Sequence, residues 1–190
     1  MGNSRETVAN VAVTLLCVVV AFTVVDTFII DKYFRKPPAA NPFRVGEDVS
    51  SIFKDAGLTS SDVTALYVIS SHCTYCVRSA EFYRRIAEMQ RRMPSGRLRT
   101  VLLAADGEAN GRQYAKSHGI AVDAVQTLPS EAWPRFTGTP TLLLIDRKGL
   151  VTGNWTGMLD ERGEQAVMSV ITRCLEGQGA GTDCPAGTCG

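Results

Sequence analysis

The stretch that decides the fold runs from residue 65 to residue 76 and reads ALYVISSHCTYC. Its first five residues are an uninterrupted apolar run, which predicts a strand buried on both faces. Cys73 and Cys76 follow, separated by two residues, where the strand gives way to a predicted helix. The free N–H groups and the positive dipole end of a helix N-terminus stabilise a thiolate. The pattern therefore predicts Cys73 as an attacking sulfur and Cys76 as the sulfur that resolves a mixed disulfide.

The chain on the C-terminal side of this stretch alternates between helical and extended patterns. Phe82, Ile86, Met89 and Met93 form one apolar stripe at helical spacing. Short apolar runs predict further buried strands, and Asp160 is a candidate N-cap for a last helix. The expected strands cover residues 65–69, 98–103, 141–145 and 150–156, and the expected helices cover 77–93, 110–118 and the residues after Asp160. This order predicts an α/β fold, with helices packed on a mixed sheet over residues 43–176.

Length and composition limit the possible classes of protein. The 190 residues carry a net charge of +1, with 45% hydrophobic and 21% charged residues. This composition is typical of one globular domain with appendages. A protein dedicated to nucleic acid would normally be strongly basic, so no nucleic-acid partner is predicted.

The N-terminal region predicts a membrane anchor. Residues 8–30 read VANVAVTLLCVVVAFTVVDTFII, which is long enough as a helix to cross a bilayer. The run has no small-x-small cleavage site, so we interpret it as an uncleaved signal anchor that lies in the lipid bilayer. Residues 1–7 form a short tail before it, and residues 31–42 form a Pro-rich linker after it. The basic residues after the run favour a cytoplasmic C-terminal domain by the positive-inside rule.

A second motif precedes the apolar strand at residues 141–145. Residues 138–149 read GTPTLLLIDRKG, with Thr139 and Pro140 at the entrance to the strand. Together with Cys73 and Cys76, in this order and on these elements, the motif resembles the thioredoxin superfamily. More narrowly, it resembles the membrane-anchored TlpA/ResA-type thiol–disulfide oxidoreductases of bacteria. The resemblance extends from about residue 43 to residue 176.

The resemblance implies a thioredoxin-like fold, a site and a location. Pro140 would be cis and lie against the cysteine pair, where it keeps metal away from the thiols. Thr139 would offer backbone hydrogen bonds to a bound peptide. The remaining residues expected to support substrate binding are His72, Thr74 and Tyr75. The domain would lie on the outer, periplasmic side of the cytoplasmic membrane, in conflict with the charge count.

The resemblance also implies partners and a reaction. The expected substrate is a protein disulfide, reduced by dithiol exchange, and a membrane electron donor would restore the dithiol. No cofactor beyond the cysteine pair is expected. The sequence departs from the family pattern at His72, where an aromatic residue is usual, and at Ser79, where many members carry Glu. An alternative interpretation is a copper-binding or redox-silent module with the same fold, because copper(I) favours thiolates.

The C-terminal tail carries a second group of cysteines. Residues 177–190 read GQGAGTDCPAGTCG, and their glycines predict a flexible segment. Cys184 and Cys189 lie in the tail, and Cys174 lies just before it on the last predicted helix. These three cysteines predict either a small structural disulfide or a second dithiol that exchanges electrons with the first. Their spacing does not match a zinc motif, so no metal site is predicted.

Overall fold

The computed structural model describes residues 13–20 and 42–177. The chain divides into two compact units, residues 1–39 and 40–190. In the first unit, residues 13–20 are helical. The rest of the predicted anchor at 8–30, the tail at 1–7, most of the linker at 31–42 and nearly all of the C-terminal tail lie outside the described residues. Within the described part of the chain, no helix is long and apolar enough to cross a membrane.

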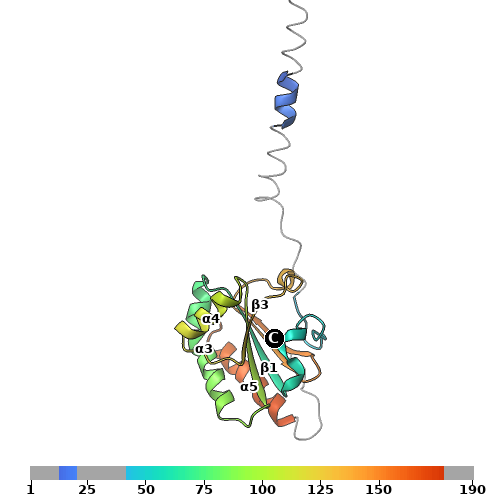
Figure 1. Ribbon diagram of the computed structural model, residues 1–190. Helices are drawn as coiled ribbons and strands as arrows, with labels where there is room; N and C mark the ends of the chain where they lie inside the picture. Colours follow the sequence, from blue (N-terminus) through green and yellow to red (C-terminus); the bar gives the residue numbers. More distant parts are fainter. Residues whose placement is uncertain (1–12, 21–41, 178–190) are drawn as a thin grey trace, which may run out of the picture. The chain divides into compact units, whose positions relative to one another are not determined.

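A five-stranded mixed sheet forms the centre of the second unit (Figure 1). The strand order is β3-β2-β1-β4-β5. β1 and β2 are parallel, as are β2 and β3, whereas β4 runs antiparallel to both β1 and β5. The strands are β1 (Val63–Ile69), β2 (Leu98–Ala104), β3 (Ala124–Thr127), β4 (Thr141–Asp146) and β5 (Val151–Thr156).

Three α-helices connect or follow these strands. α3 (Thr74–Arg91) links β1 to β2, α4 (Glu108–Ser117) links β2 to β3, and α5 (Glu161–Gly177) follows β5. The N-cap predicted at Asp160 is confirmed, because its carboxylate accepts the N–H of Gly163 at 2.8 Å. Short 3₁₀ helices lie at η2 (Lys54–Ala56), η3 (Leu58–Ser60) and η4 (Trp133–Arg135).

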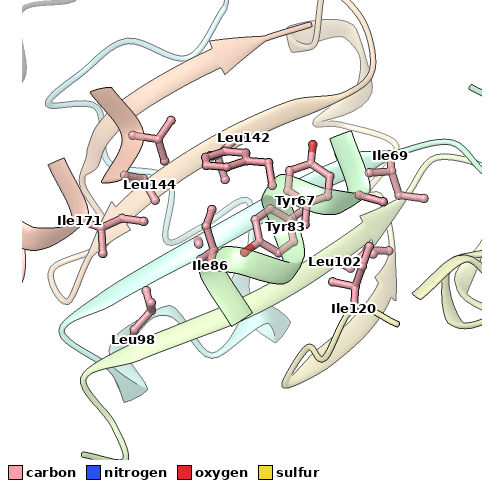
Figure 2. Close-up of a cluster of buried hydrophobic side chains, with 14 of the residues drawn as sticks. Tyr67, Ile69, Tyr83, Ile86, Leu98, Leu102, Ile120, Leu142, Leu144 and Ile171 are labelled. Atoms are coloured by element: carbon pink, nitrogen blue, oxygen red, sulfur yellow. The ribbon is translucent and has the colours of Figure 1, made fainter. Parts of the chain in front are cut away.

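The two faces of the sheet are covered differently. Alternate residues of β1, such as Tyr67 and Ile69, pack with side chains of α3, α4 and α5 in one core cluster (Figure 2). Leu66 and Val68 point to the other face, where residues 43–58 and three residues that flank η4, namely Leu128, Ala132 and Phe136, supply the covering side chains. Each large side chain buried in these clusters contributes about 1.5–3 kcal/mol. The end of β1 is therefore held in place by packed side chains on both faces of the sheet.

The segment before β1 also protects one edge of the sheet. The N–H of Gly46 donates to Val151 at 2.7 Å, and the N–H of Val151 donates to Glu47 at 2.9 Å. Asp48 forms an isolated antiparallel bridge with Leu150. The start of β5, at Val151, consequently has backbone partners on both of its sides.

The predicted α/β class, the mixed sheet and the helices that flank it are confirmed. One strand was missed, since no strand was expected at β3. The first long helix begins at Thr74 rather than at residue 77, so that the CxxC motif forms its start. Met89 and Met93 of the predicted stripe are only partly buried, whereas Tyr83, absent from that stripe, is buried.

Candidate functional site

Antiparallel pairing of β1 and β4 brings the two sequence motifs together. Val68 pairs with Thr141, so the carboxyl end of β1 lies beside the start of β4. Cys73 follows the first strand and Thr139 precedes the second, and the Cys73 thiol donates to the Thr139 carbonyl at 3.3 Å. The Thr139–Pro140 peptide bond is cis, the form that the resemblance implies. The motifs thus form one site at this end of the sheet.

Cys73 occupies the N-cap position of α3. Its sulfur accepts the backbone N–H of Cys76 at 3.4 Å, in the way that a capping side chain accepts the free N–H groups of a first turn. Partial burial works against the thiolate, but hydrogen bonds from the side chains of Thr139 and Cys76 and from the N–H groups of Cys76 and Tyr75 outweigh it. The pKa of Cys73 is therefore lowered from the ordinary thiol value.

Cys76 has the opposite environment, although it lies only one turn further along the same helix. Its side chain is fully buried. Burial and the hydrogen bond with Cys73 raise the pKa of Cys76 to about 12. Both cysteines are free thiols in this structure. The pair thus combines an accessible sulfur that ionises readily with a buried sulfur that stays protonated.

Buried tyrosines surround Cys76. The hydroxyl of Tyr114, on α4, donates to the Cys76 carbonyl at 2.5 Å. The rings of Tyr67 and Tyr83, both labelled in Figure 2, stack on one another. Their centroids are 4.4 Å apart. Burial raises the pKa of all three tyrosines. At neutral pH all three hydroxyls therefore stay protonated and do not act as bases.

A carboxylate holds the turn that leads into α3. One oxygen of Asp106 accepts the N–H of Ser71 at 2.8 Å and its hydroxyl at 2.5 Å, and it accepts the hydroxyl of Ser70 at 3.3 Å. Asp106 lies just after β2, at the same end of the sheet as Cys73, because β1 and β2 are parallel. Asp106, Tyr83 and Tyr114 were not predicted as site residues from the sequence. An acid placed just after a buried strand was the available signal for Asp106.

The other predicted site residues lie around the cysteines. His72 and Thr74 are exposed, and the side chain of Tyr75 is 56% exposed. Ser79 is buried on α3 and donates to the Tyr75 carbonyl at 2.9 Å. It therefore serves the helix itself and supplies no acid or base to the cysteines.

Three exposed apolar side chains lie on the segments that carry or adjoin the site. Tyr75 and Val77 are exposed large apolar side chains on the first turns of α3. Met158 is a third, and it follows Gly157, whose N–H donates to the Pro140 carbonyl at 2.7 Å. We call Tyr75, Val77 and Met158 the apolar rim.

The C-terminal cysteines form a separate group. Cys174 is buried on α5 and is disulfide-bonded. Its partner is not among the other described cysteines, because Cys17, Cys73 and Cys76 are free. Cys184 and Cys189 lie outside the described residues, so their pairing stays a prediction. Across residues 13–20 and 42–177, no three His, Cys, Asp or Glu side chains gather as ligands for a metal.

Comparisons with known proteins identify the fold. The chain is similar to a candidate protein disulfide isomerase from Bacteroides thetaiotaomicron, at 17% identity over 78% of this chain and 96% of that chain, with a TM-score of 0.53. It is similar to a candidate DsbE thiol:disulfide interchange protein from Chlorobium tepidum, at 18% identity over 74% and 98% of the two chains, with a TM-score of 0.50. An uncharacterized conserved protein from Geobacillus kaustophilus matches at 17% identity over 80% and 88%, with a TM-score of 0.53. No family model and no curated protein matches the sequence. The domain therefore has a thioredoxin-like fold, as the resemblance implied.

Proposed function

We propose that this protein is a thiol–disulfide oxidoreductase that reduces protein disulfides through Cys73 and Cys76. The observation that carries the proposal is the contrast between the two cysteines. The pKa of Cys73 is lowered at the start of α3, whereas burial raises the pKa of Cys76 to about 12. Dithiol exchange needs this division, because the attacking sulfur must be a thiolate and the second sulfur must wait until the mixed disulfide has formed.

The reaction proceeds in two exchanges. The Cys73 thiolate attacks one sulfur of the substrate disulfide, a new bond forms between them, and the other substrate sulfur leaves as a thiolate that takes up a proton. Cys76 then loses its proton and attacks the Cys73 sulfur, and the first substrate sulfur leaves. The substrate gains two electrons, and Cys73 and Cys76 are left as a disulfide. An electron donor must reduce this disulfide before the next cycle.

The surface around Cys73 suits a protein substrate rather than a small thiol. The apolar rim offers contact to side chains that flank a substrate disulfide, and exposed apolar groups of this kind mark interaction sites. The backbone of Thr139, beside the Cys73 sulfur, is placed to hydrogen-bond an extended peptide. His72 and Thr74 border the same surface.

The narrower parts of the proposal concern location and partners. Residues 8–30 would anchor the chain in the cytoplasmic membrane, with the domain on the periplasmic side and a membrane protein as electron donor. The apolar character and length of that run support an anchor. The resemblance to TlpA/ResA-type proteins supports the orientation and the reductive direction.

The equilibrium reduction potential of the Cys73–Cys76 pair tests the proposal. Full-length protein would be equilibrated in redox buffers, alkylated and mapped by mass spectrometry, with Cys73→Ser as the control that cannot form the disulfide. A potential near about −270 mV, as in thioredoxin, would support a reductase that depends on a donor. A potential near about −120 mV would reverse the direction to disulfide formation. If the pair did not cycle at all, the copper-binding or redox-silent module would replace the enzyme.

A further inference from the structure

Ser70 contacts both redox cysteines through its backbone. Its carbonyl accepts the N–H of Cys73 at 3.1 Å, which closes the turn between the end of β1 and the start of α3. Burial raises the pKa of Cys76, and the N–H of Ser70 opposes that effect as a donor to the Cys76 sulfur. Ser70 therefore lies next to both cysteines, with one contact to the Cys73 backbone and one to the Cys76 sulfur.

Asp106 is the side chain that holds this turn. All three of its side-chain hydrogen bonds converge on one oxygen and come from Ser70 and Ser71. Burial acts against ionisation, but these hydrogen bonds outweigh it and lower the pKa of Asp106. Asp106 is thus a carboxylate at neutral pH, and a charged acceptor strengthens each bond that it makes.

The second oxygen of Asp106 shows that this carboxylate is not placed for stability alone. Oδ1 is buried and has no hydrogen-bond partner among the described residues. A buried polar atom without a partner costs free energy, so this position is poor for stability alone. The unpartnered oxygen is explained if the hydrogen bonds between Asp106 and the turn at Ser70 and Ser71 serve the reactivity of the cysteine pair.

We infer that Asp106 is a positioning residue for the redox pair, which acts through the turn at Ser70 and Ser71 to keep Cys73 in its N-cap position on α3. The inference rests on the proposed oxidoreductase function. Asp106 itself contacts neither sulfur in any hydrogen bond of the structure. Its effect on Cys73 is carried by the backbone: when the turn is held, the N–H groups of the first turn of α3 point at the Cys73 sulfur.

A role through position and a role through charge predict opposite results. If the negative charge of Asp106 mattered most, its removal would favour the thiolate, and both Asp106→Ala and Asp106→Asn would lower the pKa of Cys73. If position matters, Asp106→Ala releases the turn and raises that pKa. Asp106→Asn keeps an amide oxygen that can accept the N–H of Ser71, so it should stay close to the native protein.

The test is the pH dependence of Cys73 alkylation in the reduced full-length chain. Iodoacetamide would be the probe, used from about pH 5 to about pH 10, with Cys73 followed by peptide mass spectrometry. We expect the Asp106→Ala profile to shift to higher pH by about one unit, which slows alkylation about tenfold at any pH below the Cys73 pKa. Asp106→Asn should restore most of the rate. An unchanged or faster rate in Asp106→Ala would overturn the inference.

The matched control is Asp123→Ala. Asp123 also accepts a backbone N–H and a hydroxyl from one residue, Thr100, at 2.7 and 3.3 Å. Thr100 pairs with Ala65 near the start of β1, so this contact lies at the end of the sheet opposite Cys73. Asp123→Ala should therefore lose stability but keep the native pH profile of Cys73 alkylation. If Asp123→Ala shifts the profile as Asp106→Ala does, the effect is general loosening and the inference fails.

A replacement variant and a readout that needs no turnover complete the experiment. If Asp106→Ala does not fold, Asp106→Ser replaces it, because serine is too short to reach Ser71, and the same slower alkylation is expected. Alkylation needs no turnover, so it separates this inference from the proposed function. A native protein that fails to reduce disulfides would contradict the function, whereas the alkylation profiles would still decide the role of Asp106.

Discussion

At the scale of single residues, position on one helix turn gives two identical side chains different chemistry. Cys73 caps α3 and receives N–H groups, whereas Cys76 lies in the core among tyrosines. The CxxC spacing alone predicted the division of roles. It could not predict the contacts that support the pair, because Tyr114, which bonds Cys76, comes from another helix and Asp106, which holds the turn before Cys73, comes from the loop after another strand. These contacts depend on the tertiary fold.

The first prediction concerns selective alkylation of the reduced pair. Cys73 should react first at neutral pH, because its pKa is lowered, and its rate should fall as the pH falls through that pKa. Cys76 should stay unmodified until strongly alkaline pH, because its pKa is about 12 and it is buried. Peptide mass mapping after timed iodoacetamide treatment measures both rates. Equal rates at Cys73 and Cys76 would contradict the assigned roles.

A second prediction compares two buried tyrosine hydroxyls. Tyr114→Phe removes a hydroxyl that donates to the Cys76 carbonyl, so it should destabilise the protein by about 1 kcal/mol. Tyr67→Phe removes a hydroxyl that is buried and has no partner among the described residues, so it should be neutral or stabilising. Urea denaturation measures both. Similar losses in the two variants would show that the hydrogen bond to Cys76 has no special weight.

At the scale of elements, close packing of α4 fixes the loop that contains Asp106. A Cβ at Gly111, on this helix, would lie 2.7 Å from Cβ of Ala104 and 2.9 Å from Cγ1 of Val125. Only glycine therefore allows the helix to lie this close to β2 and β3. β3 itself escaped sequence prediction because it is a short edge strand whose residues are half-buried or exposed, so it lacks an apolar run.

The third prediction follows from this contact. Gly111→Ala should destabilise the protein by about 1–3 kcal/mol through overpacking, which outweighs the gain of about 1 kcal/mol in helix propensity. The control is Gln113→Ala, an exposed position on the same helix where only the propensity gain applies. The midpoint of urea unfolding is the measurement. A stabilised Gly111→Ala variant would mean that α4 can move away from the sheet without cost.

At the scale of the whole domain, one face of the sheet depends on a segment without α-helix. Residues 43–58 and the residues that flank η4 cover that face. Glu47 joins the two segments by accepting two hydrogen bonds from Arg135 of η4, at 2.5 and 2.8 Å. Arg135 also lies over the ring of Phe43, 3.9 Å from its centroid. The strands that these residues cover were predictable from their apolar runs. The cover was not, because its short 3₁₀ turns show no helical period.

The fourth prediction concerns this ion pair. The hydrogen bond from Arg135 lowers the pKa of Glu47, so the pair stabilises the protein above the ordinary carboxyl pKa of 4.5 and loses its effect as the pH falls through the folded-state pKa. Glu47→Gln should cost about 1 kcal/mol at neutral pH and little at about pH 3. Urea unfolding at both pH values measures the difference. Glu131→Gln, at an exposed site, is the control.

The hydrogen bonds between residues 46–49 and the start of the last strand affect how readily copies of the chain associate through the edge of the sheet. An unpaired outer strand is a template on which a second chain can add its own strand, and this is a common route to aggregation. Here the bonds between Gly46, Glu47 and Val151 occupy the beginning of that template from within the same chain. A second copy held close by would find the start of this edge already paired. A proteolytic cut that released residues 43–49 would free it, and stronger self-association of the cut domain is expected.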